Sequence, residues 1–361
     1  MKILHVEMGR HLYGGARQVV YLLDGLAAFP GEHGLVCAEG SDIATAIRNP
    51  AVKIHPLKSS GDLDLGFIER LRLVIRAEQP DLLHIHSRRG DMMAAMAGRW
   101  ENLPMVHSRR VDNQPSVFDL RVKFPLFDKI VTISDGIRQV LLQTGVPAGQ
   151  IICIPSAVDT GRFKPEVERE SFLAEFGLRG GEPILAMIAQ LIPRKGHAVF
   201  FDALPQVLAR HPDTQALIFG RGPLQDALRG TVQERGLERH IRFVGFRTGM
   251  EAVIPHVGLV VHPAFREGLG VALLETAACG VPIVACRAGG IPEIVRDGVN
   301  GRLLEPGDSA GLAEAINALL DDPAQLAAYG EAGRRLVLEH FSIPRMVEQN
   351  RRVYLELLGL P

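Results

Sequence analysis

The chain alternates short β-rich runs with amphipathic stretches, and this alternation limits the folds that it can adopt. In the first half, strands are predicted at 2–8, 33–39, 82–87, 105–108, 129–134 and 151–156. Between them lie stretches whose apolar residues recur at helical spacing, such as 16–29 and 67–79. Strands and helices in alternation predict a parallel sheet that helices cover on both faces.

A second series of the same kind fills the other half. Its predicted strands are 183–191, 214–220, 241–246, 259–264 and 282–286, separated by helical runs such as 197–212 and 311–322. A chain of 361 residues is long for one core, so two domains are expected. The proline- and charge-rich stretch 163–170 reads as their linker.

These boundaries predict an N-terminal domain over 1–165 and a C-terminal domain over 166–342. The last segment, 343–361, contains an amphipathic run that we expect to cross back to the first domain. Each domain is expected to be α/β and doubly wound, with its ligands beyond the carboxyl ends of the strands.

Composition restricts the possible partners and compartment. The net charge of −1 creates no general attraction to nucleic acid, so no nucleic-acid partner is expected. The N-terminus lacks the pattern of a signal peptide, and no apolar run reaches the roughly 18 residues of a membrane span. We therefore expect a cytoplasmic protein. Its four cysteines lack the spacing of metal ligands and are interpreted as reduced thiols.

Glycines and cations follow several of the predicted strands. Gly14 and Gly15 stand between the first strand and a helix, where they could admit an anion or simply form a tight turn. Arg194 and Lys195, in the run PRKG, suit a diphosphate, with plain solvated charge as the alternative. The run GRGP (220–223) also ends a strand, but a bare G-x-G is a weak signal.

The stretch FREGLGVALLE (265–275) places two carboxylates around a glycine-rich turn. Glu267 is expected in the loop after strand 259–264, and Glu275 in the following helix. The amides of 268–270 then gather at that helix N-terminus, which favours a negative group. A metal site is not favoured, because His262 is the one further ligand candidate nearby and its strand could point it elsewhere.

These motifs together resemble one family. FREGLGVALLE is followed by ACGVPIVA and AGGIPEIVRDGVNGRLLEPGD, and VDTGRFKP (158–165) stands at the domain link. Together with the Gly14-Gly15 loop, PRKG and GRGP, they look like glycosyltransferase family 4, the retaining GT-B enzymes (glycosyl transferases group 1). The resemblance covers almost the whole chain. It implies two Rossmann-like domains that face each other across a cleft.

The resemblance also assigns roles to matching residues. Glu275 would bind the ribose of the sugar nucleotide, and Glu267 would contact the donor sugar. Four residues would be catalytic: Glu267, His107, Arg194 and Lys195, of which the two cations also grip the diphosphate. The other donor-binding positions implied are Gly14, Gly15, Gly220, Gly222, Phe246, Gly268, Leu269 and Gly270.

The chain departs from the family pattern at two places. Pro155-Ser156-Ala157 stands where Pro-Asn-Gly is usual before the domain link, and Ala189 stands where glycine is usual. The first change is expected to alter hinge geometry, and the second leaves the backbone less freedom. The run HSRRVDN (107–113) suggests an acceptor site rich in arginine.

The function implied is hexosyl transfer, with retention, from a nucleotide sugar to an acceptor hydroxyl. No cofactor or metal is expected. The acceptor implied is a glycan or glycolipid of a bacterial envelope, of the lipopolysaccharide type, with peripheral contact at the cytoplasmic face of the inner membrane. Two alternatives stay open: a sugar-nucleotide epimerase of GT-B architecture, and a non-catalytic protein that binds sugar nucleotides.

Overall fold

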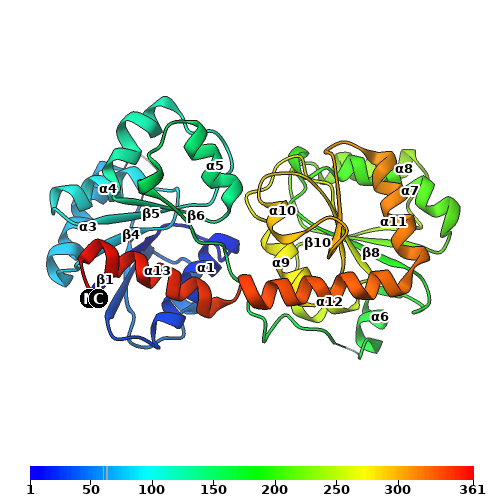
Figure 1. The fold of residues 1–361 in the computed structure, drawn as a ribbon, viewed down its shortest axis with the longest axis horizontal. Coiled ribbons are helices and arrows are strands. Elements are labelled where there is room, and N and C mark those ends of the chain that lie inside the picture. Colours follow the sequence, from blue (N-terminus) through cyan, green and yellow to red (C-terminus); the bar gives the residue numbers. More distant parts are fainter. Residues whose placement is uncertain (60, 62–63, 167) are drawn as a thin grey trace. The chain divides into compact units, whose positions relative to one another are not determined.

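The chain forms two compact units. A computed structural model describes residues 1–59, 61, 64–166 and 168–361. The first unit contains Met1–Ala157 together with Ile343–Pro361, and the second contains Val158–Ser342 (Figure 1). The division falls after Ala157, so the described residues of the stretch 163–170, interpreted above as the linker, belong to the second unit.

The first unit is a seven-stranded parallel sheet of order β3-β2-β1-β4-β5-β6-β7. Its strands are β1 (Lys2–Glu7), β2 (Glu32–Ala38), β3 (Lys53–Leu57), β4 (Leu82–Ile85), β5 (Met105–Arg109), β6 (Lys129–Thr132) and β7 (Ile151–Cys153). Its α-helices are α1 (Gly14–Leu26), α2 (Ile43–Ala46), α3 (Leu65–Glu78), α4 (Asp91–Trp100), α5 (Asp135–Gln143) and α13 (Ile343–Leu358). The strand order reverses between β1 and β4, and ligands of such sheets bind at this point.

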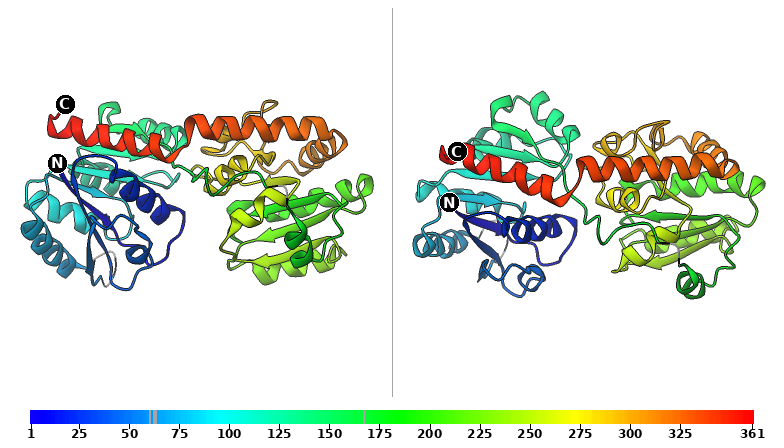
Figure 2. Two further views of the ribbon diagram at one scale, coloured as in Figure 1. Left: turned by 90° about the horizontal axis from the view of Figure 1, so that it is seen from below. Right: turned by 60° about the horizontal axis from the view of Figure 1, so that its bottom comes forward.

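Helices cover both faces of this sheet. On one face, α3 and α4 pack on the strands, with Phe67 and Leu71 fully buried. On the other face, α1 and α13 lie side by side although they come from opposite ends of the chain (Figures 1 and 2). Leu22, Leu26 and Tyr354 share one buried cluster there, so the amphipathic C-terminal run closes the core of the first unit.

The second unit is a six-stranded parallel sheet of order β10-β9-β8-β11-β12-β13. Its strands are β8 (Ile184–Ile188), β9 (Gln215–Phe219), β10 (Ile241–Gly245), β11 (Leu259–His262), β12 (Ile283–Cys286) and β13 (Gly301–Leu304). Its α-helices are α6 (Glu170–Phe176), α7 (His197–Arg210), α8 (Gln225–Glu234), α9 (Val271–Ala278), α10 (Ile291–Ile294), α11 (Ser309–Asp321) and α12 (Pro323–His340). Here the order reverses between β8 and β11.

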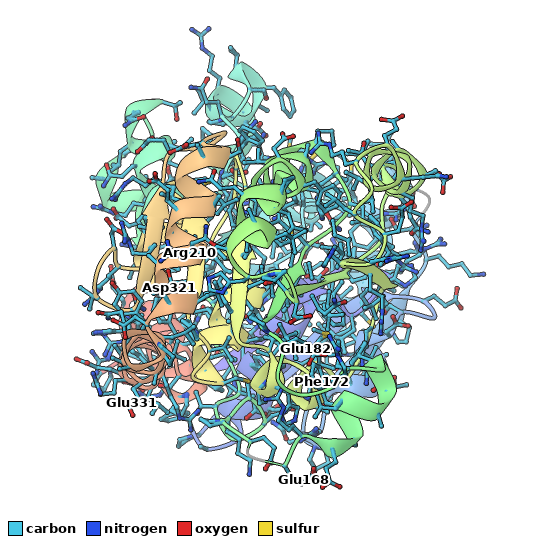
Figure 3. The ribbon with its side chains drawn as sticks, turned by 90° about the vertical axis from the view of Figure 1, so that its right-hand side faces the viewer. Glu168, Phe172, Glu182, Arg210, Asp321 and Glu331 are labelled. Atoms are coloured by element: carbon cyan, nitrogen blue, oxygen red, sulfur yellow. The ribbon has the colours of Figure 1, made fainter. Side chains whose placement is uncertain are left out.

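Helices α7 and α11 pack together on this sheet. Phe200, Phe201 and Leu204 of α7 are fully buried in one cluster with Leu312 and Ile316 of α11. An ion pair between Arg210 and Asp321 joins the ends of the same two helices (Figure 3). The surface pair adds little stability, because exposed ion pairs contribute about 1 kcal/mol or less.

The α/β fold with two doubly wound sheets is confirmed, and two strands were not predicted. Strand β3 (KIHPL) lies at the sheet edge, is not fully buried and contains Pro56, which edge strands tolerate. Strand β13 (GRLL) is short and also lies at an edge. Neither has the continuous apolar run by which the central strands were found. Within the described residues no helix is long and apolar enough to cross a membrane.

Candidate active site

Glu267 lies between a lysine and a histidine at the carboxyl ends of β8 and β11. Its Oε2 forms an ion pair with Lys195 Nζ and accepts a hydrogen bond from His262 Nε2 at 3.0 Å. Lys195 is 7% exposed and His262 is 2% exposed. The structure therefore brings two predicted catalytic residues into contact, and it rules out the interpretation of Lys195 as solvated surface charge.

The ion pair keeps the Glu267 carboxyl ionised. Burial alone would raise its pKa, but the hydrogen bond and charge of His262 and the charge of Lys195 outweigh burial and lower the pKa to about 2. At neutral pH this group is a carboxylate and not a proton donor. It can stabilise positive charge that develops beside it.

Two glycines with left-handed backbone allow these loops to meet. A Cβ on Gly196 (φ +74°) would lie 1.9 Å from the Pro263 carbonyl oxygen, and one on Gly289 (φ +53°) would lie 1.7 Å from that of Glu267. The Phe265 amide also donates to the Arg194 carbonyl at 2.9 Å. The glycine of PRKG and that of GGIPE thus hold the backbone on either side of the carboxylate.

The turn after Glu267 leads into α9 as predicted. Gly270 adopts φ +98° and caps the helix, and Glu275 lies half-buried within it. The Gly268 amide donates to Glu267 Oε1 at 3.2 Å. That amide therefore helps to hold the carboxylate, and Leu269 is buried.

The GRGP turn packs against the loop after β8. A Cβ on Gly220 would lie 1.9 Å from the Ala189 carbonyl oxygen, and one on Gly222 would lie 2.4 Å from that of Leu191. These glycines serve close backbone packing. Nearby, the Arg221 guanidinium lies 4.9 Å from the ring centroid of Phe246, which is 54% exposed. An exposed aromatic ring of this kind can stack on a planar base.

In the first unit, Gly14 and Gly15 are the first two residues of α1, whereas the helix was predicted to start after them. A Cβ on Gly15 would lie 3.2 Å from Cδ of Arg110, so the glycine leaves room for that side chain. Burial lowers the pKa of Arg110, and Glu7 opposes this effect.

His107 belongs to β5 and is 4% exposed. Its ring stacks on Phe127 with the centroids 4.7 Å apart. Burial, together with the charges of Lys123 and Arg109, lowers its pKa to about 3, so the ring is neutral at neutral pH. It lies in the first unit, and its role towards a donor sugar stays a prediction.

Sequence reasoning gave no donor-site role to two buried histidines. His262, which bonds Glu267, was considered only as a metal ligand that its strand could point elsewhere, and its neighbour His197, the first residue of α7, was not singled out. Burial lowers the pKa of His197 to about 4. Both its ring nitrogens, and Nδ1 of His262, are buried without a hydrogen-bond partner among the described residues. Polar atoms at such depth are usually satisfied, so a bound ligand or water would suit them.

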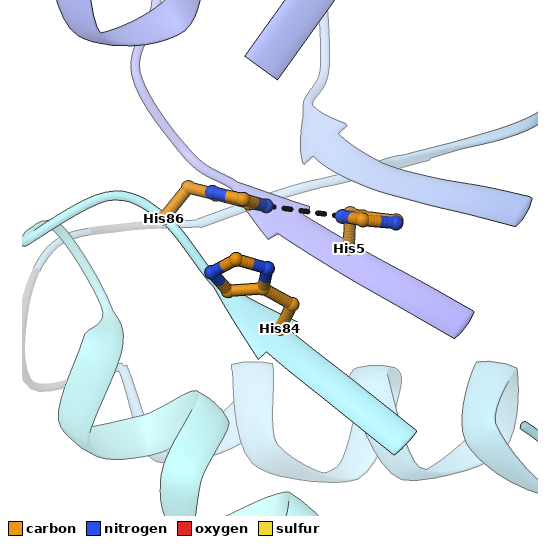
Figure 4. A group of neighbouring side chains, drawn as sticks. All are labelled: His5, His84 and His86. Carbon is orange, nitrogen blue, oxygen red and sulfur yellow. Dashed lines mark hydrogen bonds between the residues drawn. The ribbon is translucent and has the colours of Figure 1, made fainter. Parts of the chain in front are cut away.

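Among the described residues, the potential metal-ligand atoms of three buried histidines, His5, His84 and His86, lie within 4.8 Å of one another (Figure 4). His5 and His84 are paired in register across β1 and β4, and His86 follows on the same face. The H-x-H spacing at 84 and 86 is the signal that could have found this group.

Hydrogen bonds already connect these rings to their neighbours. The chain runs from His33 Nδ1 to His5 Nε2 (3.4 Å), His5 Nδ1 to His86 Nε2 (3.0 Å), His86 Nδ1 to Ser108 Oγ (3.4 Å), Ser108 Oγ to His84 Nε2 (2.9 Å), and His84 Nδ1 to Tyr354 Oη (2.6 Å). Neutral imidazoles, each with one donor and one acceptor, satisfy every link. A metal ion would have to break some of these bonds.

Burial keeps the histidines of this hydrogen-bond network uncharged. It lowers the pKa of His5, His84 and His86 well below 6.5, and the Arg110 guanidinium adds to the effect at the latter two. The network joins the sheet to α13 through Tyr354, so it stabilises the return of the chain to the first unit.

Two doubly wound parallel sheets are the architecture of the GT-B class of glycosyltransferases, and the chain shares this fold. Residues 13–162 match the model of Glycosyltransferase Family 4, and residues 168–336 match that of Glycosyl transferases group 1. The chain belongs to this family.

Several curated relatives act on inositol lipids or phosphates. The chain is 31% identical, over 61% of its length, to a GDP-mannose-dependent α-(1-6)-phosphatidylinositol monomannoside mannosyltransferase of Mycolicibacterium smegmatis. It is 31% identical, over 53% of its length, to a D-inositol 3-phosphate glycosyltransferase of Nocardia farcinica. The matches cover 57% and 44% of these relatives, so the chain spans about half their length.

Solved structures share the fold. Anabaena HepE, in complex with UDP and glucose, superposes with a TM-score of 0.86 over 99% of this chain and all of that one, at 22% identity. The lipopolysaccharide outer core galactosyltransferase WaaB gives a TM-score of 0.73 over 99% of this chain and all of that one, at 17% identity.

The burial of Lys195 generates a stability prediction. Lys195→Ala should lower the free energy of unfolding of the second unit by about 3 kcal/mol, because it leaves the buried Glu267 carboxylate without its cation. Denaturant unfolding measures the change. The double variant Lys195→Ala/Glu267→Gln should recover part of the loss. Equal stability of Lys195→Ala and the wild type would contradict the ion pair.

The histidine network generates a prediction about acid. Burial, with the N-terminal amino group, lowers the pKa of His33 to about 4. The unfolded chain therefore binds a proton at His33 more readily than the folded chain does. The folded state has its full stability above pH 6.5 and loses stability as the pH falls from 6.5 to 4. The slope per histidine is at most about 1.4 kcal/mol per pH unit. His33→Gln should flatten the pH dependence of the first unit's melting by up to this amount; an unchanged slope would contradict the assignment.

Proposed function

We propose that the protein transfers a hexosyl group from a nucleotide sugar to an acceptor hydroxyl, with retention at the anomeric carbon. The observation that carries the proposal is the buried Glu267 carboxylate, held ionised by Lys195 and His262 at the carboxyl ends of β8 and β11. A fixed negative charge in this position suits an oxocarbenium-like transition state. The relatives named above, a mannosyltransferase and an inositol phosphate glycosyltransferase, support the same reaction class.

Donor binding is proposed to use the loops that border this carboxylate. Arg194 and Lys195 would meet the diphosphate, and the N-terminus of α9 would add the favourable end of the helix dipole. Glu275 would accept hydrogen bonds from the ribose. The exposed Phe246 ring, with Arg221 against it, would stack on the base.

The chemical step is proposed as attack on the face that the diphosphate leaves. The leaving phosphate oxygen takes the proton of the acceptor hydroxyl, so no side chain needs to donate one. A carboxylate whose pKa is about 2 agrees with this, because it stabilises charge without exchanging protons. The cations Arg194 and Lys195 offset the charge on the departing diphosphate, and catalysis without a divalent metal is proposed for that reason.

The acceptor is proposed to be a glycan or glycolipid of the bacterial envelope, reached from the cytoplasmic face of the membrane. The phosphatidylinositol acceptors in the names of relatives, and the outer-core transferase among the similar structures, support an envelope substrate. An epimerase is less well supported, since these relatives are transferases. A non-catalytic sensor would bind donor without hydrolysing it. Slow donor hydrolysis by the purified protein would therefore distinguish a transferase from a sensor.

The two glutamates should fail in different ways. Glu267→Gln should lower kcat by about a hundredfold or more, because it removes the charge beside the reacting carbon. Glu275→Gln should mainly raise the KM for the donor, since its contacts are to the ribose in both ground and transition states. Steady-state kinetics with the donor identified by thermal-shift screening measures both. If Glu267→Gln raised KM alone, the proposed roles would be wrong.

A further inference from the structure

A cavity of about 140 Å³ lies in the first unit at the carboxyl ends of four neighbouring strands. The residues that line it come from the end of β2 and from the loops after β1, β2, β3 and β4, and they include the point where the strand order reverses. They are Met8, Arg10, Ala38, Glu39, Lys58, Ser59 and Arg89. In doubly wound sheets this is the place where ligands bind.

Three of the lining side chains are cations that come from three different loops. Arg10, Lys58 and Arg89 are exposed, and within the part of the chain that the structure describes their side chains form no ion pair or hydrogen bond. Some other cations of the same unit are paired, such as Arg70 with Asp64 and Arg72 with Glu101, but what sets these three apart is that they line one cavity. Three unpaired like charges around one cavity repel each other unless an anion joins them.

We propose that this cavity binds a phosphate group of the sugar acceptor. The inference rests on the proposed function and extends it, since it assigns the acceptor a chemical class: a hydroxyl compound that carries a phosphate ester. Arg10 and Arg89 offer planar forked donors that match phosphate oxygens, and Lys58 adds a point charge.

Glu39 distinguishes this cavity from a site for a bare anion. It is the one carboxylate among the lining residues, and no described ion pair joins it to Arg10, Lys58 or Arg89. A carboxylate accepts hydrogen bonds from hydroxyl groups. The lining therefore suits a phosphate with a hydroxyl nearby, as in a phosphorylated polyol or sugar.

The donor diphosphate is assigned to other residues. Arg194 and Lys195, which would hold it, belong to the second unit, whereas every residue that lines this cavity belongs to the first. The phosphate expected here is therefore that of the acceptor. The same chemistry can come from a soluble phosphate ester or from a lipid headgroup.

The test is calorimetric titration of the full-length protein with glycerol 3-phosphate, while saturating nucleoside diphosphate occupies the donor site. Arg89→Gln and Arg10→Gln should each weaken binding about tenfold, because each removes a charged hydrogen-bonding partner. Arg88→Gln is the matched control: it alters an adjacent exposed arginine that does not line the cavity, and binding should stay within about twofold. Glycerol, without phosphate, should not bind.

A second arm identifies the source of the phosphate. Flotation with phosphatidylcholine vesicles, with and without phosphatidylglycerol, measures binding to a lipid headgroup. The cavity is supported if either probe binds and if Arg89→Gln weakens that binding while Arg88→Gln does not. The probe that binds shows whether the phosphate comes from a soluble ester or from a lipid headgroup. If neither probe binds, or if both variants lose binding equally, the proposal is overturned.

Failure of this proposal can be told apart from failure of the proposed function. Binding of nucleoside diphosphate and hydrolysis of the donor depend on residues assigned in the second unit and are measured without any phosphate probe. A protein that hydrolyses donor but ignores both probes would refute the cavity alone. A protein that binds glycerol 3-phosphate through Arg89 but never binds a nucleotide would refute the proposed function.

Discussion

The contact between Lys195, Glu267 and His262 is the interaction on which the rest of the site depends. A carboxylate with little access to water is costly unless it is paired. Lys195 comes from the loop after β8, and His262 ends β11. Both can contact Glu267 only if these neighbouring strands end at the same level. The parallel sheet provides this alignment. The ion pair then fixes the protonation state of Glu267, and with it the chemistry that the site can perform.

Backbone geometry supports that contact from both sides. Gly196 and Gly289 each pass so close to a carbonyl that a side chain would collide with backbone. A side chain at either position would force the neighbouring backbone to move. Gly15 has a milder role in the first unit, where the nearest neighbour is the side chain of Arg110. Glycine-containing motifs that look alike in sequence thus differ in how closely their backbone packs against its neighbours.

Sequence patterns predicted the two sheets well because most strands are continuous apolar runs with helical runs between them. They missed β3 and β13, which are edge strands without such runs. They placed the domain boundary between residues 165 and 166, because proline and charge at 163–170 resemble a linker, whereas the two compact units divide after Ala157. The partners of Glu267, and the hydrogen-bonded network that contains His5, His84 and His86, depend on strand register, which periodicity does not specify.

The most direct test of the central claim is the protonation state of Glu267. Carbon-13 NMR of the glutamate side-chain carboxyls, with Glu267→Gln to assign the resonance, follows this group as the pH is lowered. We expect its chemical shift to stay that of a carboxylate through pH 4.5, because Lys195 and His262 hold its pKa at about 2. A resonance that titrates at or above pH 4.5 in the folded protein would contradict the ion pair and the electrostatic role built on it.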